Sequence, residues 1–365
     1  MVLGKIIKNG SLNMASYMAL AMVKQFVVFP VVAKQDLEKF IVTVSIISAI
    51  ELAIYSIAGA ASDIHSREHA QKVNPGICIF SLLGVVMIGV MVPLSALGLL
   101  VFVLAFSVCL LNQLQIRRWQ HQDNFYSGVI FNIFRSIFYI TFIWSERYEV
   151  ALVLWLLIEV FLYFFFSRRS FSGFSAAVIR SDHIYCVVAF ISIGLIFRGE
   201  VIFSGRFPAS ELVAGFAVIS LISMPANMFL GTPLLCAIRD GSARGLVTIK
   251  TLSVMILYPV LAYFFMDWLY QFLYGGEFPI SKELAMLAIV VSILVVPART
   301  YIIMTESGKS LLMVLVFGAF LGVVLSIPFL LEGFYSDFIN IIVLGIAMKV
   351  GIFIAVLLNR LRHGW

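Results

Sequence analysis

Eight charged side chains of this chain lie inside long apolar runs. They are Lys24, Arg135, Arg198, Arg299 and Lys349, together with Glu51, Glu159 and Glu200. If these runs cross a bilayer, each charge at mid-depth costs about 2.5–3.5 kcal/mol, and eight facing lipid cost on the order of 20 kcal/mol. That total matches or exceeds the stability of a typical folded protein. We therefore expect these side chains to face a polar cavity, to pair, or to reach toward the membrane surface.

The charges inside the apolar runs are unbalanced, with five cations and three carboxylates. This excess suits a substrate with a phosphate or diphosphate group, whose charge must be held in a region of low dielectric constant. An exporter of cationic drugs should show the reverse sign. Two roles stay open for Glu51 and Glu159. They are structural partners of Lys24 or Arg135, or one of them is a coupling site for a proton or Na⁺.

Two of the cations belong to polar stripes at helical spacing. Residues three, four or seven positions apart lie on one face of an α-helix. One stripe contains Asn13, Tyr17 and Lys24, and the other contains Gly128, Asn132, Arg135 and Tyr139. We expect both stripes to face the protein interior.

The other charges have different geometry. Arg198 and Glu200 are two residues apart, so they point to nearly opposite sides of a helix and cannot form a local pair. Arg299 and Lys349 lie toward the predicted cytoplasmic ends of their apolar runs. Each of these two side chains either snorkels to the membrane surface or faces the cavity.

Cysteine and histidine give no sign of a redox, metal or catalytic centre. The four cysteines fall inside or at the end of apolar runs without a CxxC pair, and no histidine lies at metal-ligand spacing. We interpret the cysteines as small apolar residues, with no disulfide and no metal site. The five histidines lie near the predicted cytoplasmic ends of the apolar runs, where solvation is a simpler role than catalysis.

Composition indicates a membrane protein. Hydrophobic residues make up 62% of the 365 residues and charged residues only 12%, whereas soluble domains carry about 25% charged residues. Lipid must therefore be part of the solvent. The net charge of +6 is typical of basic cytoplasmic loops, and no loop carries the basic and aromatic pattern of a nucleic-acid surface.

Apolar runs of about 20 residues, each sufficient to cross a bilayer core, predict an all-α integral membrane protein with about twelve transmembrane helices. The runs lie roughly at 14–33, 40–60, 76–93, 96–115, 127–144, 149–166, 184–203, 212–235, 248–266, 284–304, 310–330 and 338–358. The third and fourth runs are the least distinct, because only Pro93 to Gly98 separates them. All loops are short, so any function must be built inside the bilayer.

Basic residues predict the orientation. Five of the 25 lie inside apolar runs and five lie in loops of one side, which leaves fifteen on the side shared by both termini. Cytoplasmic loops carry the excess of lysine and arginine in membrane proteins. We therefore expect both termini in the cytoplasm.

A short internal repeat suggests two halves. The segment KQFVVF from Lys24 to Phe29 resembles RGEVIF from Arg198 to Phe203, and an acidic residue heads the next run in each case, Glu38 or Glu211. Six predicted spans precede the second copy, and an even number of spans makes the halves parallel repeats. We expect two six-helix bundles, 1–180 and 181–365, facing each other across a central cavity.

Two stretches carry a family resemblance. The stretch from Arg198 to Met228 has a charged helix end, a short loop closed by Ser210 and Glu211, and then a helix rich in small residues. A Gly-Glu-Phe turn at Gly276 precedes the tenth predicted span. In these features the chain resembles the polysaccharide transporters, including O-antigen flippases, of the multidrug/oligosaccharidyl-lipid/polysaccharide (MOP) exporter superfamily.

The resemblance implies a MOP/MATE-like fold and a transporter rather than an enzyme. The resemblance implies that this transporter flips undecaprenyl-diphosphate-linked oligosaccharide across the bacterial cytoplasmic (inner) membrane. The flipped oligosaccharide would be used to build O-antigen, lipopolysaccharide or capsule. The resemblance also implies Lys24, Arg198 and Arg135 as diphosphate contacts. The remaining charges would be cavity or coupling residues, namely Glu51, Glu159, Glu200, Arg299 and Lys349. No cofactor is implied beyond H⁺ or Na⁺ coupling, since no GxxxxGK[ST] loop occurs.

The implied partners are membrane lipid, the lipid-linked oligosaccharide and the polysaccharide polymerase machinery. Two alternatives stay open: a small-molecule or drug exporter of the same fold, and a membrane polysaccharide polymerase. Sequence patterns do not indicate the sugar, the coupling ion or the oligomeric state.

Overall fold

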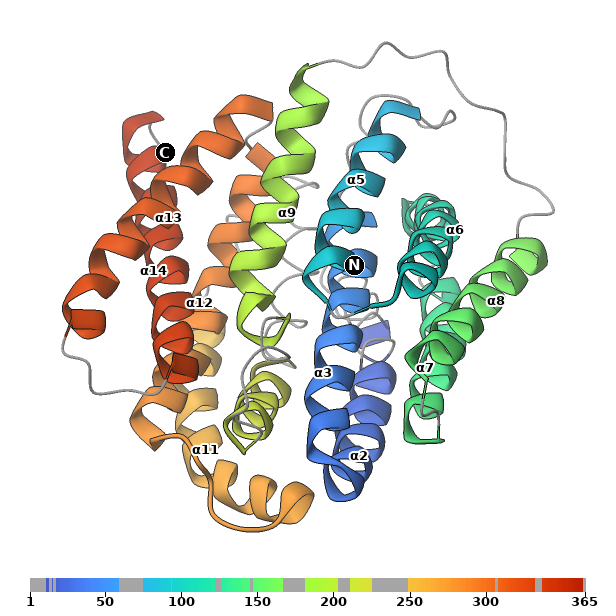
Figure 1. Ribbon diagram of the computed structural model, residues 1–365. Helices are drawn as coiled ribbons and strands as arrows, with labels where there is room; N and C mark the ends of the chain where they lie inside the picture. The colour runs from blue at the N-terminus through green and yellow to red at the C-terminus, as the bar shows by residue number, and fades with distance from the viewer. Residues whose placement is uncertain are drawn as a thin grey trace. The chain divides into compact units, whose positions relative to one another are not determined.

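The computed structural model describes most of the chain as helices (Figure 1). The described ranges are 11–12, 15, 18–58, 75–92, 94–121, 126–144, 147–166, 181–202, 211–224, 249–305, 308–331 and 337–363. Within these ranges every regular element is a helix and no strand occurs. The predicted all-helical class is confirmed for this part of the chain.

Several of these helices are long and apolar enough to cross a membrane. The 5 stretches that qualify are Met18–Gln35, Ala96–Ile116, Tyr148–Phe165, Lys309–Pro328 and Ile339–Asn359. Shorter apolar helices occupy other predicted spans, at Cys78–Val90, Gly128–Trp144, Val187–Ile196 and Glu211–Met224. Together they indicate a membrane-embedded protein. The count of about twelve spans stays a prediction.

The chain divides into two compact units. One contains Ala15–Arg206, and the other contains Phe207–Trp365 with Met1–Met14. The helix α9 (Ser181–Ile202) belongs to the first unit, where it packs against α3 (Leu37–Leu52). By packing, α9 therefore groups with the helices before it, whereas the expected division at residue 180 groups it with those after it.

The first two helices of the Ala15–Arg206 unit each contain a π-helical segment. The segment η1 (Val23–Val28) continues into α2 (Phe29–Gln35), and α3 continues into η2 (Ala53–Ala58). Because η1 and α2 are consecutive parts of one helix and α2 packs against α3, these elements form a helical hairpin.

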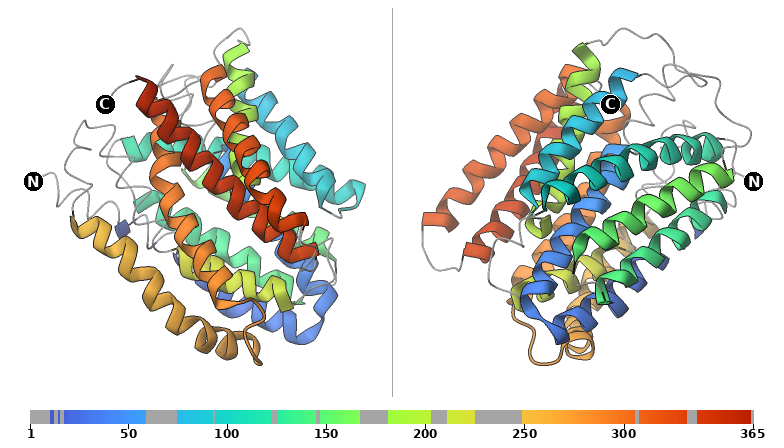
Figure 2. Two further views of the ribbon diagram at one scale, coloured as in Figure 1. Left: turned by 90° about the vertical axis from the view of Figure 1, so that its left-hand side faces the viewer. Right: turned by 45° about the vertical axis from the view of Figure 1, so that its right-hand side comes forward.

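Four more helices of this unit follow. They are α5 (Pro75–Met91), α6 (Ala96–His121), α7 (Tyr126–Trp144) and α8 (Tyr148–Phe166). The helices α5 and α6 are separate, which confirms the predicted break near Pro93. In Figure 2, α6, α7 and α8 lie side by side, and α8 packs against both of the others.

Three turns of this unit meet at one end. The Asp36 side chain begins α3 by accepting hydrogen bonds from the N–H groups of the next turn, as an N-cap does. Nearby, Lys39 Nζ donates to the carbonyl of Ile143 at the end of α7, at 3.3 Å. Between α5 and α6, Ser95 Oγ donates to Glu149 Oε1 of α8 at 2.7 Å. Successive hairpins therefore turn on the same side, as the alternating topology predicts.

The second unit contains helical residues 211–224 and four longer helices. These are α11 (Ile249–Tyr274), α12 (Lys282–Thr305), α13 (Gly308–Leu331) and α14 (Asp337–His363). Gly275 and Gly276 make the turn from α11 to α12 with φ angles of 77° and 79°. Only glycine adopts this backbone region readily, so the predicted Gly-Glu-Phe turn has a physical cause.

The helices α13 and α14 pack closely against each other (Figure 2). A Cβ added to Gly322 would lie 2.4 Å from Met348 Cα, and one added to Gly318 would lie 2.7 Å from Ile352 Cα. Gly351 on α14 contacts the backbone of α13 in the same way. Small residues four positions apart let membrane helices pack backbone to backbone, and here they join neighbouring helices of one chain.

Candidate functional site

A buried ion pair joins the first two helices. Lys24 Nζ in η1 lies 2.6 Å from Glu51 Oε1 in the last turn of α3. The two side chains are only 8% and 4% exposed. The same ammonium lies 6.0 Å from the centre of the Phe29 ring, which is within cation–π range. The carboxylate neutralises the ammonium, so neither charge faces lipid.

Pro30 explains why the helix widens at Lys24. Proline has no N–H, and its ring crowds the carbonyl four residues earlier, here that of Phe26. The N–H of Phe29 donates instead to the Lys24 carbonyl five residues back, the bonding pattern of a π-helix. The wide turn accommodates Pro30, and it places Lys24 where the helix hydrogen bonds deviate from the α pattern.

Other buried polar side chains lie on the same two helices. Gln25 follows Lys24, while Ser45 and Ser48 precede Glu51 at intervals of three residues. At this spacing the three α3 residues share one helix face. Gln25 Oε1 and Ser45 Oγ have no hydrogen-bond partner within the described part of the chain. Buried polar atoms without partners cost free energy, so this interior can stabilise a polar ligand.

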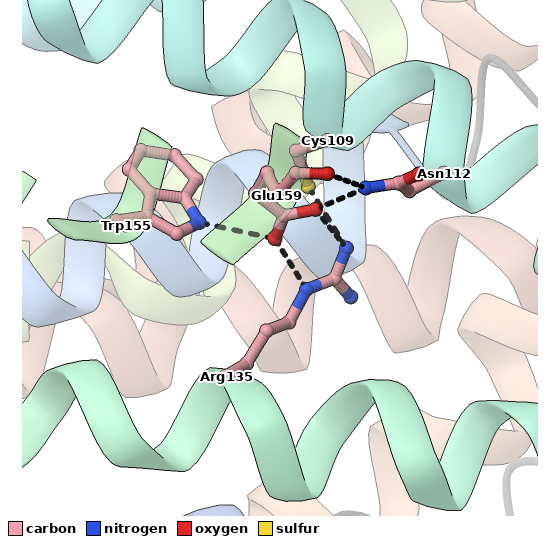
Figure 3. Close-up of polar contacts among 5 residues, drawn as sticks. All are labelled: Cys109, Asn112, Arg135, Trp155 and Glu159. Carbon is pink, nitrogen blue, oxygen red and sulfur yellow. Dashed lines mark hydrogen bonds and ion pairs between the residues drawn. The ribbon is translucent and has the colours of Figure 1, made fainter. Parts of the chain in front are cut away.

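A second buried ion pair joins α7 to α8 (Figure 3). Arg135 Nε donates to Glu159 Oε1 at 2.5 Å, and Arg135 Nη2 donates to Oε2 at 2.9 Å. Both side chains are 0% exposed. Two parallel hydrogen bonds from one guanidinium to one carboxylate are the strongest geometry for such a pair.

Three further residues complete the network around Glu159. Asn112 Nδ2 donates to Oε2 at 2.7 Å and to the Glu159 carbonyl at 2.9 Å. Trp155 Nε1 donates to Oε1 at 3.1 Å. Arg135 Nη2 also contacts Cys109 Sγ at 3.3 Å (Figure 3). The carboxylate therefore accepts from α6, α7 and α8 at once and holds the three helices together.

This packing bears on the roles left open for the glutamates. Glu51 and Glu159 lie against Lys24 and Arg135, which is the pairing that one of the two interpretations expects, and a coupling role for either glutamate stays a prediction. The Arg135 guanidinium also lies 5.6 Å from the Phe131 ring. Its role as a diphosphate contact stays a prediction, because a substrate would have to replace these interactions.

The polar stripe on α7 faces inward, as its spacing predicts. Gly128, Asn132, Arg135 and Tyr139 are all buried. The segment η1 packs against α7, so this stripe and Lys24 belong to the same interior. Asn13 and Tyr17 of the other stripe lie outside the described residues.

The remaining predicted site residues lie in other helices. Lys349 lies in the middle of the apolar stretch Ile339–Asn359 and is 4% exposed. It is therefore buried and lies away from the end of the apolar run, where it was expected, and the choice between snorkelling and facing a cavity stays a prediction. Arg198 and Glu200 lie on α9 and Arg299 lies on α12, and their side chains are outside the described part.

Sequence patterns alone do not single out Asn112, Trp155 or Gln25 as site residues. Two signals were present: Asn112 is a polar residue in a long apolar run, and Trp155 precedes Glu159 by one helical turn. However, only the packing of α6 against α8 shows that Asn112 and Glu159 meet.

Fold and site together define the class as a membrane-embedded protein whose described residues are all-helical and include two buried ion pairs in its first unit. No protein family, curated protein or solved structure matches the chain. Among the described residues, no group of three or more His, Cys, Asp or Glu side chains could hold a metal ion. The function therefore has to be inferred from the residues and their packing.

Proposed function

We propose that this chain is a transporter that flips an undecaprenyl-diphosphate-linked oligosaccharide from the inner to the outer leaflet of a bacterial cytoplasmic membrane. The flipped units supply a surface polysaccharide of the O-antigen or capsule type. In this proposal about twelve spans form two six-helix bundles of the MOP type, with both termini in the cytoplasm.

The observation that carries the proposal is Lys24, buried in a π-helical segment of an apolar helix. An ammonium inside a membrane protein requires an anionic partner. Glu51 fills that role here at 2.6 Å, and a diphosphate offers negative charge with more acceptor oxygens. Arg198, at the matching position of the internal repeat, lies on α9, which packs against α3 in the same unit.

The overall charge balance also supports an anionic substrate. Pairing two cations with two glutamates leaves the excess of five cations over three carboxylates unchanged at two. The other charges inside the apolar runs are Arg198, Arg299, Lys349 and Glu200, three cations and one carboxylate. Positive charge held inside the protein stabilises a diphosphate while the lipid tail stays in the bilayer and the sugar crosses.

A proton or Na⁺ gradient drives the cycle in this proposal, with Glu200 and the two paired glutamates as the candidate coupling residues. No further cofactor is required. The polymerase machinery that joins the flipped units is the expected partner.

The decisive experiment is to identify the lipid-linked intermediates that accumulate when the gene is deleted. We expect oligosaccharide units on undecaprenyl diphosphate to accumulate on the cytoplasmic face. Single units that reach the outer face without being joined would instead identify a polymerase. Normal surface glycan together with new drug sensitivity would identify a drug exporter.

Lys24 provides a test at residue level. We expect Lys24→Ala to lower surface glycan display at least about tenfold, equivalent to about 1.4 kcal/mol in the transport barrier, with the protein still present in the membrane. Lys24→Arg should be milder because it keeps the charge. Lys34→Ala, at an exposed position in α2, is the matched control and should give normal display.

Arg198 extends this test to the second copy of the repeat. Arg198→Ala should lower display as Lys24→Ala does. Wild-type display in both alanine variants would remove these two residues from the mechanism.

A further inference from the structure

We propose that Glu51 occupies the anion-binding position of Lys24 in the resting protein and competes there with the diphosphate group of the substrate. This inference rests on the proposed function, because it concerns the same site. It adds the device that regulates access to Lys24: substrate binds only when the Glu51 carboxylate leaves.

The geometry of the pair supports direct competition. Lys24 Nζ and Glu51 Oε1 are 2.6 Å apart, and both side chains are nine-tenths buried. Carboxylate and phosphate oxygens are the same kind of acceptor for an ammonium group. A diphosphate that binds Lys24 at this position therefore takes the place that Glu51 now holds.

Both helices at this pair contain a π-helical segment. Lys24 is the second residue of η1, and Glu51 lies two residues before η2 begins. Short π-helical segments inside α-helices are often found at functional sites. Pro30 fixes the π pattern of η1, whereas η2 contains no proline, and a shift of η2 between i→i+5 and i→i+4 bonding rotates the side chains on one side of the segment relative to those on the other. Such a rotation separates Lys24 from Glu51 without unfolding either helix.

The pair formed by Arg135 and Glu159 shows what a fixed pair looks like in the same unit. That carboxylate accepts hydrogen bonds from Asn112 and Trp155 as well as from Arg135. Both of its helices, α7 and α8, are α-helical throughout. Lys24 and Glu51 lie at π-helical segments instead, and this difference in helix geometry gives them the exchangeable role.

A displaced Glu51 carboxylate has a hydrogen-bond donor on its own helix. Ser48 lies three residues before it on the same buried face of α3. A hydroxyl donor at this spacing lowers the cost of moving the carboxylate away from Lys24.

The test measures binding of farnesyl diphosphate, a short polyprenyl diphosphate, to the full chain in lipid nanodiscs by titration calorimetry. When a site is closed most of the time, its apparent affinity falls in proportion to the open fraction. We expect Glu51→Gln to bind at least about tenfold more tightly than wild type, as for a site open about a tenth of the time. Glu38→Gln, an exposed position on the same helix, should leave the affinity unchanged.

Lys24→Gln and the double variant with Glu51→Gln should both lose binding, because the cation itself is removed. If wild type binds and Glu51→Gln binds equally or more weakly, the competition is wrong while the proposed function stands. If neither wild type nor Glu51→Gln binds any diphosphate, the proposed function fails as well.

A second readout uses only wild-type protein, because Glu51→Gln leaves a buried ammonium and can fail to fold. Dicyclohexylcarbodiimide labels membrane-embedded carboxyl groups that are not held in ion pairs. Saturating farnesyl diphosphate should raise labelling of Glu51 several-fold and leave Glu159 unlabelled. Unchanged labelling of Glu51 in protein that binds the probe would overturn the inference.

Discussion

Glu51 and Glu159 are the same residue type in the same unit, and their surroundings give them different roles. Glu159 accepts hydrogen bonds from residues on three helices. Glu51 meets Lys24 at the edge of a π-helical segment. A carboxylate with several fixed donors is costly to move, so Glu159 is suited to a structural role.

Glu159→Gln tests the structural role. The amide keeps the shape of the side chain but leaves the Arg135 charge buried without its counter-ion, which costs about 3–5 kcal/mol when one partner of a buried pair is removed. We expect a lower midpoint of thermal unfolding in detergent and less protein in the membrane. Arg135→Gln combined with Glu159→Gln should recover much of the loss, and a wild-type midpoint in the single variant would contradict the role.

At the scale of elements, one proline sets the local geometry of the first helix. Pro30 cannot donate to a preceding carbonyl, and the Lys24 carbonyl is bonded to Phe29 N–H in the π pattern. The geometry of the Lys24 ion pair thus depends on a residue that takes no part in it.

Pro30→Ala supplies the missing N–H and removes the ring, so η1 can adopt α-helical bonding. Lys24 then rotates relative to Glu51 and the pair weakens. A double-mutant cycle of Lys24 and Glu51, followed by the unfolding midpoint in the wild-type and Pro30→Ala backgrounds, measures this weakening, because neighbouring residues couple by about 0.5–3 kcal/mol. We expect the coupling between Lys24 and Glu51 to fall by at least about half in the Pro30→Ala background. Pro328→Ala in α13 is the control, and equal coupling in both backgrounds would rule out a role for Pro30.

The pairing of α13 with α14 depends on glycine in a different way. Any side chain at Gly322 meets the α14 backbone, with Met348 Cα at 2.4 Å, and backbone cannot move aside without separating the helices. We expect Gly322→Val to destabilise the second unit by at least about 1–3 kcal/mol, the usual cost of overpacking. Val324→Leu, at an exposed position of the same helix, should leave the unfolding midpoint unchanged.

At the scale of the whole molecule, basic residues and turns both bear on topology. Fifteen of 25 basic residues lie on one predicted side, and the turns near Asp36, Ser95 and Arg147 meet at one end of the first unit. We expect alkaline phosphatase fused after Ser95 or Gly275 to be active, because it folds only outside the cytoplasm. A fusion after Trp365 should be inactive, whereas green fluorescent protein at that position should fluoresce. Alkaline phosphatase activity of the fusion after Trp365 would indicate an odd number of membrane spans.

The helix positions follow from the sequence because apolar runs of bilayer length exclude other structures in lipid. Helices begin and end close to the predicted boundaries, including the break between α5 and α6. The inward direction of Arg135 and Tyr139 follows from spacing alone, since residues one turn apart share a face. Local pattern is sufficient for these features because they depend on neighbours in the chain.

The partners of the charges depend on packing between distant segments. Glu51 is 27 residues from Lys24 and Glu159 is 24 from Arg135, and no periodicity indicates which of several helices will meet. The π-helical turn at Lys24 and the burial of Lys349 are equally invisible in hydropathy. A charge in a membrane protein takes its role from whichever oppositely charged group the folded helices bring within reach, and that choice is made by three-dimensional packing.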